Sequence, residues 1–290
     1  GTLQVSSDNF STCVQMSSSP TVSSDYKTFT FTPSSNLSFT TTYKIRVTTG
    51  VKDEGAGNAL SSQYETGTGF TSEAIPSFVA VSNSGTIITS SDGTTWTSRT
   101  SGTGNSLNGV TYDNSTFLVV GGSGTILISS DGISWTSKTS GTPKNFWGVT
   151  YGNSTLVAVG ESGIIFSSSD NGTTWTSRTS GISNWLMEIT FGNSKFVAVG
   201  PNDNVALTSS DGTTWTKTSS SASLFNNLRA VTFGNNTFVA VGGSGKVSTS
   251  SDNGSNWTSR TSGTTDGLRG VAFGNNTFVA AGTYGTILTS

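Results

Sequence analysis

Short apolar runs alternate with polar turns along most of the chain, with the spacing expected of strands. In the stretch 228–262 the runs are LRAVTFG, TFVAVG, GKVSTSS and NWTSRTS. The second run is apolar on both faces, as in an inner strand covered on both sides, whereas the fourth alternates Trp, Ser and Thr and suits an edge strand facing water. Gly, Asn, Ser and Asp, which join the runs, favour tight turns. The stretch predicts four antiparallel strands.

This pattern recurs at a nearly constant interval. A tryptophan marks the fourth run of each repeat, at Trp96, Trp135, Trp175, Trp215 and Trp257. Their spacing suits a four-stranded blade of a β-propeller, for which a period of roughly 40–45 residues is usual. We expect an all-β fold with about six four-stranded blades, although the first and last repeats each lack one strand. YETGTGF at 64–70, or residues outside this chain, would complete a six-bladed ring; five blades with surplus residues 277–290 are the alternative.

The string around each of these tryptophans resembles a known repeat. Ser168, Asp170, Gly172, Thr174 and Trp175 match the Asp box, S-x-D-x-G-x-T-W, of BNR or sialidase-like propellers. The resemblance implies a structural turn in which Asp accepts backbone N–H groups and Trp packs between blades. The other copies, three of which are one residue shorter, place the same pair of residue types at Asp92 and Trp96, Asp131 and Trp135, Asp211 and Trp215, and Asp252 and Trp257.

The N-terminal segment 1–72 carries no copy of this repeat and predicts a separate domain, leaving 73–290 for the propeller. Its alternating runs LQVS, TCVQM, TFTFTP and TTYKIRVTT indicate strands. The string at 31–60 resembles bacterial Ig-like domains, which implies a β-sandwich, here with five or six strands and without the opening one. Asp53 and Glu54 are a candidate cation site, but two adjacent acids in a glycine-rich turn favour a solvated loop.

The composition argues against several classes of function. Fourteen basic and sixteen acidic residues give a net charge of -2, which argues against nucleic-acid binding, and no apolar run is long enough for membrane insertion. The chain has no histidine, the usual general base and a common zinc ligand, so we expect no metal and no cofactor. Cys13, the only cysteine, is interpreted as a partly buried structural thiol.

Two catalytic interpretations are weak. Arg99, Arg178 and Arg260 suggest the arginine triad of a sialidase, but each follows a box tryptophan by three residues and belongs on an outer strand. The carboxylates outside the boxes lie in different repeats at unmatched positions: Glu161, Glu188, Asp203 and Asp266. We therefore expect no enzyme.

Variation between repeats is concentrated on one face. In an antiparallel blade, the turns between the second and third strands and the links to the next blade emerge together. These links read TGNSLN, TPKNFW, ISNWLM, SASLFNNLR and TTDGLR, and with the second-to-third turns they define what we call the variable face. Diverse loops on a rigid scaffold favour recognition. Its candidate ligand-binding residues are Trp147, Trp185, Phe225, Arg229, Arg269, Glu161, Asp203 and Tyr284.

Part of this face has an alternative structural interpretation. Phe146, Leu186, Leu228 and Leu268 recur at the starts of the first runs and could fill the central channel. For the leucines we favour this packing role.

We expect a non-catalytic binding or adhesion protein, secreted or on a bacterial cell surface, that recognises a glycan or a protein. A structural subunit of a surface layer or appendage, assembled from copies of the chain, is the first alternative. A glycan-active, sialidase-like hydrolase is the second.

Overall fold

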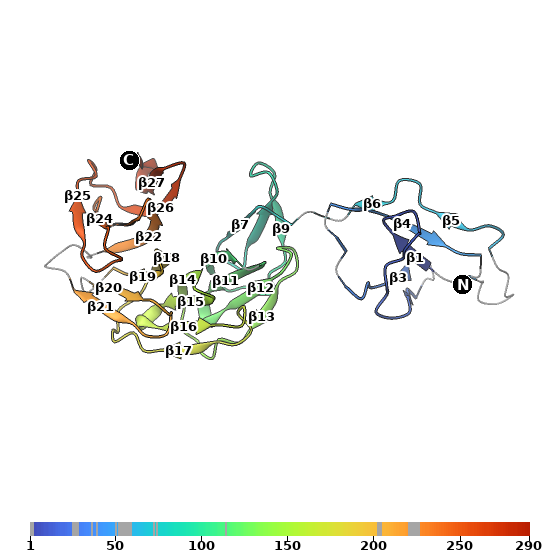
Figure 1. Ribbon diagram of the computed structural model, residues 1–290, viewed down its shortest axis with the longest axis horizontal. Helices are drawn as coiled ribbons and strands as arrows, with labels where there is room; N and C mark the ends of the chain where they lie inside the picture. The colour runs from blue at the N-terminus through green and yellow to red at the C-terminus, as the bar shows by residue number, and fades with distance from the viewer. Residues whose placement is uncertain are drawn as a thin grey trace. The chain divides into compact units, whose positions relative to one another are not determined.

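The computed structural model describes residues 3–24, 29–35, 37–38, 40–49, 51, 60–71, 73, 75–113, 115–201, 205–219 and 227–290. The regular elements in these ranges are β-strands and three short 3-10 turns. The chain divides into two compact units, Gly1–Ile75 and Pro76–Ser290 (Figure 1). No helix in the described part is long and apolar enough to span a membrane.

The first unit is a small antiparallel β-structure around β4 (Thr42–Val47). This strand pairs with β1 (Leu3–Ser6) along one edge and with β5 (Tyr64–Glu65) and β6 (Phe70–Thr71) along the other. A separate hairpin joins β2 (Thr21–Val22) to β3 (Phe29–Thr30). Val5 and Tyr43 are the buried apolar residues of this unit in the described ranges.

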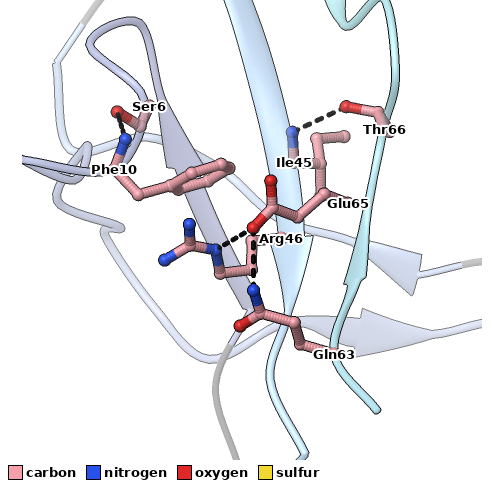
Figure 2. A network of polar contacts seen from close by, with 7 residues as sticks. All are labelled: Ser6, Phe10, Ile45, Arg46, Gln63, Glu65 and Thr66. Carbon is pink, nitrogen blue, oxygen red and sulfur yellow. Dashed lines mark hydrogen bonds and ion pairs between the residues drawn. The ribbon is translucent and has the colours of Figure 1, made fainter.

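An arginine-centred network ties β4 to its surroundings (Figure 2). The Arg46 Nε donates to Glu65 Oε1 at 2.7 Å, and Gln63 Nε2 donates to the same oxygen at 3.0 Å. The Arg46 guanidinium also lies over the Phe10 ring, 3.8 Å from its centroid. A cation held against both a carboxylate and an aromatic face stabilises a unit with few buried apolar side chains.

Two sequence expectations for this unit are wrong. The segment YETGTGF does not complete a propeller blade, because its two ends form β5 and β6 and pair with β4. Cys13 is exposed rather than partly buried. Asp53 and Glu54 lie outside the described residues.

The second unit contains six consecutive antiparallel sheets, as the repeat count predicted. The first is β7 (Phe78–Val81), β8 (Ile87–Ser90) and β9 (Thr97–Arg99). The second is β10 (Leu107–Asp113), β11 (Thr116–Gly121), β12 (Ile126–Ser129) and β13 (Thr136–Lys138). The third is β14 (Phe146–Gly152), β15 (Thr155–Gly160), β16 (Ile165–Ser168) and β17 (Thr176–Arg178).

The remaining three sheets follow the same order. The fourth is β18 (Glu188–Gly192), β19 (Lys195–Val199), β20 (Val205–Ser209) and β21 (Thr216–Ser219). The fifth is β22 (Leu228–Gly234), β23 (Thr237–Gly242), β24 (Val247–Ser250) and β25 (Thr258–Arg260). The last is β26 (Leu268–Gly274), β27 (Thr277–Gly282) and β28 (Ile287–Thr289). Residues 277–290 therefore belong to a sixth sheet, and the alternative of five blades with surplus residues is wrong.

The first and last sheets have three strands each, and the expected closed ring is not formed. We call the first strand of each four-stranded sheet the inner strand and the fourth the outer strand. In the described residues, the first sheet lacks the inner strand and the last sheet lacks the outer strand. Figure 1 shows these two sheets at separate ends of an arc. Backbone positions Gly270 and Gly274 of the last sheet accordingly face open space.

The turns follow from the residues that form them. Asn235 and Asn236, between β22 and β23, have φ values of 44° and 59°, and the copies of this hairpin at 153–154, 193–194 and 275–276 repeat the pair of positive angles. Two successive positive φ angles match the right-handed twist of the flanking strands. Asparagine adopts this conformation more readily than most residues, which explains its repetition there.

Neighbouring sheets pack through matched small and large residues on their inner strands. The ring of Phe191 occupies the space where a side chain on Gly152 would lie, and Phe233 does the same over Gly192. Phe273 repeats the contact over Gly234. Each of these seams therefore requires a glycine from one sheet and an aromatic residue from the next.

The box strings form the expected turns between third and fourth strands. In the longer copies, Asp170 Oδ1 accepts the Thr174 backbone N–H at 2.9 Å, and Asp170 Oδ2 accepts the Thr174 hydroxyl. In the shorter copies the aspartate accepts two backbone N–H groups, as Asp92 does from Thr94 and Thr95 at 2.8 Å each. These hydrogen bonds lower the pKa of Asp170 to about 2 and that of Asp92 further.

The third, fourth and fifth boxes lie on the sheet before them. Gly172 packs on Leu118, Gly212 on Val157 and Gly254 on Val197, all from second strands of the preceding sheets. The tryptophans Trp135, Trp175, Trp215 and Trp257 join the apolar clusters at these seams. Trp96 belongs to the first sheet of the unit and is 42% exposed, compared with 7% for Trp257.

The difference between these tryptophans predicts a difference in stability. Trp257→Ala should reduce the free energy of unfolding by about 3 to 5 kcal/mol, because it removes a buried aromatic side chain from a seam. Trp96→Ala, the matched control, should cost less than about 1 kcal/mol. Urea unfolding of both variants measures this. Equal losses would show that the box tryptophan stabilises its own turn and not the seam.

Candidate recognition surface

The variable face is assembled from the starts of the inner strands and the second-to-third turns. In the third sheet, Phe146 pairs with Gly160, and the Glu161 N–H donates to the Asn145 carbonyl at 2.9 Å. Equivalent bonds run from Gly122 to Ser106, from Gly243 to Asn227 and from Thr283 to Gly267. The turn and the start of the inner strand are thus held side by side in repeated sheets.

One position on this face varies in chemistry from sheet to sheet. It is the second residue of the inner strand or, in the fourth sheet, the residue just before that strand, and it is occupied by Asn108, Trp147, Met187, Arg229 and Arg269 in turn. The Asn108 amide reaches the next sheet and donates to the Phe146 carbonyl at 2.7 Å. Side chains at this position therefore can bridge neighbouring sheets.

Trp147 and Trp185 form the one aromatic pair among the predicted ligand-binding residues in the described ranges. Their rings stack with centroids 5.6 Å apart and an interplanar angle of 26°. Trp185 is 45% exposed, whereas Trp147 is half-buried and its indole N–H is buried without a hydrogen-bond partner. The pair thus consists of a half-buried ring, Trp147, stacked on an accessible one, Trp185.

The other predicted residues are dispersed. Arg229 is half-buried, Arg269 is exposed, and Tyr284 is 95% exposed in the turn of the last sheet. The Glu161 carboxylate accepts the Asn145 N–H at 3.3 Å, so it also helps to fix the turn. Phe225 and Asp203 lie outside the described residues.

The large residues expected to fill the channel are instead part of the seams. Leu186, Leu228 and Leu268 are buried in clusters that join two sheets, and Phe146 is fully buried in the same way. Filling of a central channel, the role favoured for the leucines, is therefore wrong, because they and Phe146 pack between neighbouring sheets.

Glu188 is the unusual acidic residue of this region. It begins β18, its Oε1 lies over Gly148 of the neighbouring inner strand, and it accepts the Ile189 N–H at 3.0 Å. Removal of the carboxyl group from water raises the pKa of Glu188 to about 7. From the sequence it was one of several scattered acids, because the glycine that makes room for it belongs to the preceding repeat.

Shallow grooves recur beside the second-to-third turns. The groove of the third sheet has a volume of about 630 Å³ and is lined by 162–164 and 177–183, with Lys217 from the next sheet. Comparable grooves of about 460 and 670 Å³ lie in the second and fifth sheets. Each is bordered by hydroxyl groups and at least one basic side chain.

The outer-strand arginines do not converge on a common point. The Nε atoms of Arg99, Arg178 and Arg260 donate to Thr89, Ser167 and Thr249 on the adjacent strands of their own sheets, at 2.8 to 3.0 Å. These residues lie on the outer strands, as the sequence predicted. In the described ranges, no group of three or more His, Cys, Asp or Glu residues gathers as a metal site.

Comparison with known domains agrees with this division of the chain. Residues 2–72 match the bacterial Ig-like domain family, and residues 78–186 match the DUF6242 beta propeller domain. No curated protein sequence matches the chain.

Solved propellers resemble the chain in fold. A structure described as YCF48 bound to D1 peptide is 22% identical, with a TM-score of 0.59 and 73% of each chain covered. A streptogramin B lyase is 13% identical, with a TM-score of 0.60 and 74% of this chain and 82% of the other covered. A catalytically inactive virginiamycin B lyase from Staphylococcus aureus with quinupristin is 15% identical, with a TM-score of 0.60 and coverages of 93% and 92%.

At these identities the structures show fold and not activity. The family matches and the sheet topology lead to one conclusion: the chain consists of a bacterial Ig-like domain followed by a β-propeller domain.

Proposed function

We propose that the propeller domain is a non-catalytic binding module that recognises a protein segment through its variable face. The observation that carries this proposal is the stacked Trp147–Trp185 pair, with Trp185 exposed on a face where the scaffold changes its side chains from sheet to sheet. Aromatic and arginine side chains contribute most strongly to protein recognition. Arg229 and Arg269, at the same repeat position as Trp147, supply cations for acidic or carbonyl groups of the ligand.

The recurring polar residues of the repeat already have partners within the propeller, which leaves ligand binding to the variable face. The aspartates are engaged in turn hydrogen bonds, which also supports classing the strings as Asp boxes. The outer arginines are bonded along their own sheets. The largest changes between repeats lie on the variable face.

The structural neighbours include lyases as well as a protein solved with a bound peptide, and the latter supports a protein ligand. The inactive lyase carries a histidine-to-alanine substitution, whereas this chain contains no histidine. Catalysis of that kind would need a different general base here.

We further propose that the protein works outside the cell, on a bacterial surface or after secretion. The bacterial Ig-like domain supports this location, because such domains commonly occur in series on exposed proteins. In this arrangement the first unit would act as a spacer for the propeller. Reduced surface labelling of intact cells compared with lysed cells would contradict it.

The binding proposal predicts a localised loss of affinity. Peptides selected on an array with the wild-type chain should bind Trp147→Ala/Trp185→Ala about 30-fold more weakly, a loss of about 2 kcal/mol typical of aromatic anchors. Tyr112→Ala is the control, since this tyrosine is 52% exposed at the other end of an inner strand. Calorimetric titration measures both. Equal losses in the two variants, or none in the tryptophan variant, would contradict the proposal.

Glu188 should make the stability of the propeller depend on pH. Its pKa is raised from 4.5 in the unfolded chain to about 7, so the folded state holds the proton more tightly between these values. The free energy of unfolding should therefore fall as the pH rises through this window, and the loss should be complete above pH 7. Melting temperatures of wild type and Glu188→Gln at pH 5 and pH 8 provide the test. The same pH dependence in both proteins would show that the Glu188 carboxyl group is not the cause of it.

A further inference from the structure

The groove of the third sheet differs in charge from the equivalent grooves of the second and fifth sheets. The groove of the second sheet has one basic residue, Lys138, and that of the fifth has two basic residues together with Asp266. The groove of the third sheet is lined by Arg178 and Lys217, and none of its described lining residues is acidic. The carboxylate of Glu161, in the adjoining turn, accepts a backbone N–H ahead of β14 and does not line this groove.

Lys217 is a departure from the repeat. The second residue after the box tryptophan is serine in the other four copies, at Ser98, Ser137, Ser177 and Ser259. Lys217 is exposed on β21 of the fourth sheet and borders the groove of the third. Arg178 borders it from β17, and because only its Nε donates to Ser167, both terminal guanidinium nitrogens remain as donors. Two neighbouring sheets thus each supply a cation to one groove.

The apolar residues of this groove also depart from the repeat. Ile164, in the second-to-third turn, occupies the position of Thr125 in the second sheet and Lys246 in the fifth. Ile182, in the link to the next blade, occupies a position at which both of those sheets have threonine. The two isoleucines are half-buried, so part of each side chain is accessible in the groove.

The exposed Trp185 lies next to the same groove. It follows the lining residue Ser183 by two positions, which separates them by at most about 7 Å along the chain. The Trp185 carbonyl lies against Gly200, and the residues that make the same contact in other sheets are Ser106, Asn145, Asn227 and Gly267. Trp185 is therefore another departure from the repeat.

These four departures come from separate parts of the sequence and meet at one place on the variable face. They are Ile164, Ile182, Trp185 and Lys217. The other sheets form the same groove with threonine, serine and asparagine, so packing of the sheets does not require the changes. A common ligand explains why they occur together.

We infer that this groove binds an extended acidic peptide segment, with its carboxylates beside Lys217 and Arg178 and an apolar side chain on Ile164 and Ile182. The inference rests on the proposed function, because the same segment would continue onto Trp185. Ammonium and guanidinium groups both pair with carboxylates. A free inorganic anion would use the two cations but neither the isoleucines nor the indole, so the groove fits a peptide better.

The probe is an array of synthetic peptides in which each core sequence occurs in three versions. These carry glutamate, glutamine or lysine at the same positions on both sides of an apolar residue. The wild-type chain should retain the glutamate version of a core most strongly and the lysine version least, and salt should reduce the difference because it screens exposed charges. Equal retention of glutamate and glutamine versions, or no retention at all, would overturn the inference.

Variants that restore the repeat locate the site without disturbing the fold. Lys217→Ser should weaken binding of the best glutamate peptide about fivefold at low salt and leave its glutamine version unchanged, as expected for an exposed charge pair. Lys138→Gln is the matched control, because it removes the same charge from the groove of the second sheet. Ile182→Thr should weaken both versions about fourfold, the effect of one buried methylene. Calorimetric titration measures all three.

The tryptophan variant separates failure of this inference from failure of the proposed function. Equal losses in Lys217→Ser and Lys138→Gln, or a loss in neither, would overturn the role of the groove. Recognition by the variable face would still stand if Trp147→Ala/Trp185→Ala lost affinity for the same peptides. Conversely, charge-dependent binding that is weakened by Lys217→Ser but not by the tryptophan variant would support the groove and contradict the proposed function.

Discussion

The propeller depends on apolar seams between neighbouring sheets. No sheet can bury both of its faces alone, so each relies on the next to cover the apolar strand at its centre. The seams are specific because an aromatic ring from one inner strand lies over a glycine of the previous one, as Phe191 lies over Gly152. The box tryptophan closes the outer part of the same seam. Packing, rather than charge or catalysis, therefore explains why the string is repeated.

Because the seams hold the sheets together, the residues of the variable face can change without loss of the fold. The box turns at the opposite face are constrained by the aspartate hydrogen bonds, so their residues recur. At the starts of the inner strands only one residue in each sheet must be buried, namely the leucine or phenylalanine of the seam. The next position carries asparagine, tryptophan, methionine or arginine without affecting that contact, which is how one scaffold presents different chemistry around a face.

The sequence predicted the parts of this structure that depend on local residues and on the repeat. The six sheets, the burial of TFVAVG as the second strand of its sheet and the box turns follow from periodicity and turn chemistry. What it could not predict depends on which neighbour is present. Tyr112 occupies the repeat position of the packed residues Phe191 and Phe233, yet it is 52% exposed, because the first sheet has no inner strand in the described residues to supply the glycine beneath it.

Similar limits apply to YETGTGF and to the candidate site. The alternation in YETGTGF suits any free strand edge, and the edge of β4 in its own unit is the one it pairs with. Trp147 and Trp185 were both predicted on the variable face, but their stacking arises from the packing of two sheets and has no local signal. Burial of Glu188 likewise depends on a glycine in another repeat.

Native-state hydrogen exchange tests most directly whether seams hold the propeller together. If each sheet is stabilised by its neighbours, amides in the second strands of the interior sheets, β15 and β19, should be the most protected. Amides of β7 and β27, whose sheets have a neighbour on one side only, should exchange at a lower opening free energy. Equal protection of the end and interior sheets would contradict the account, because it would mean that the sheets do not depend on the seams between them.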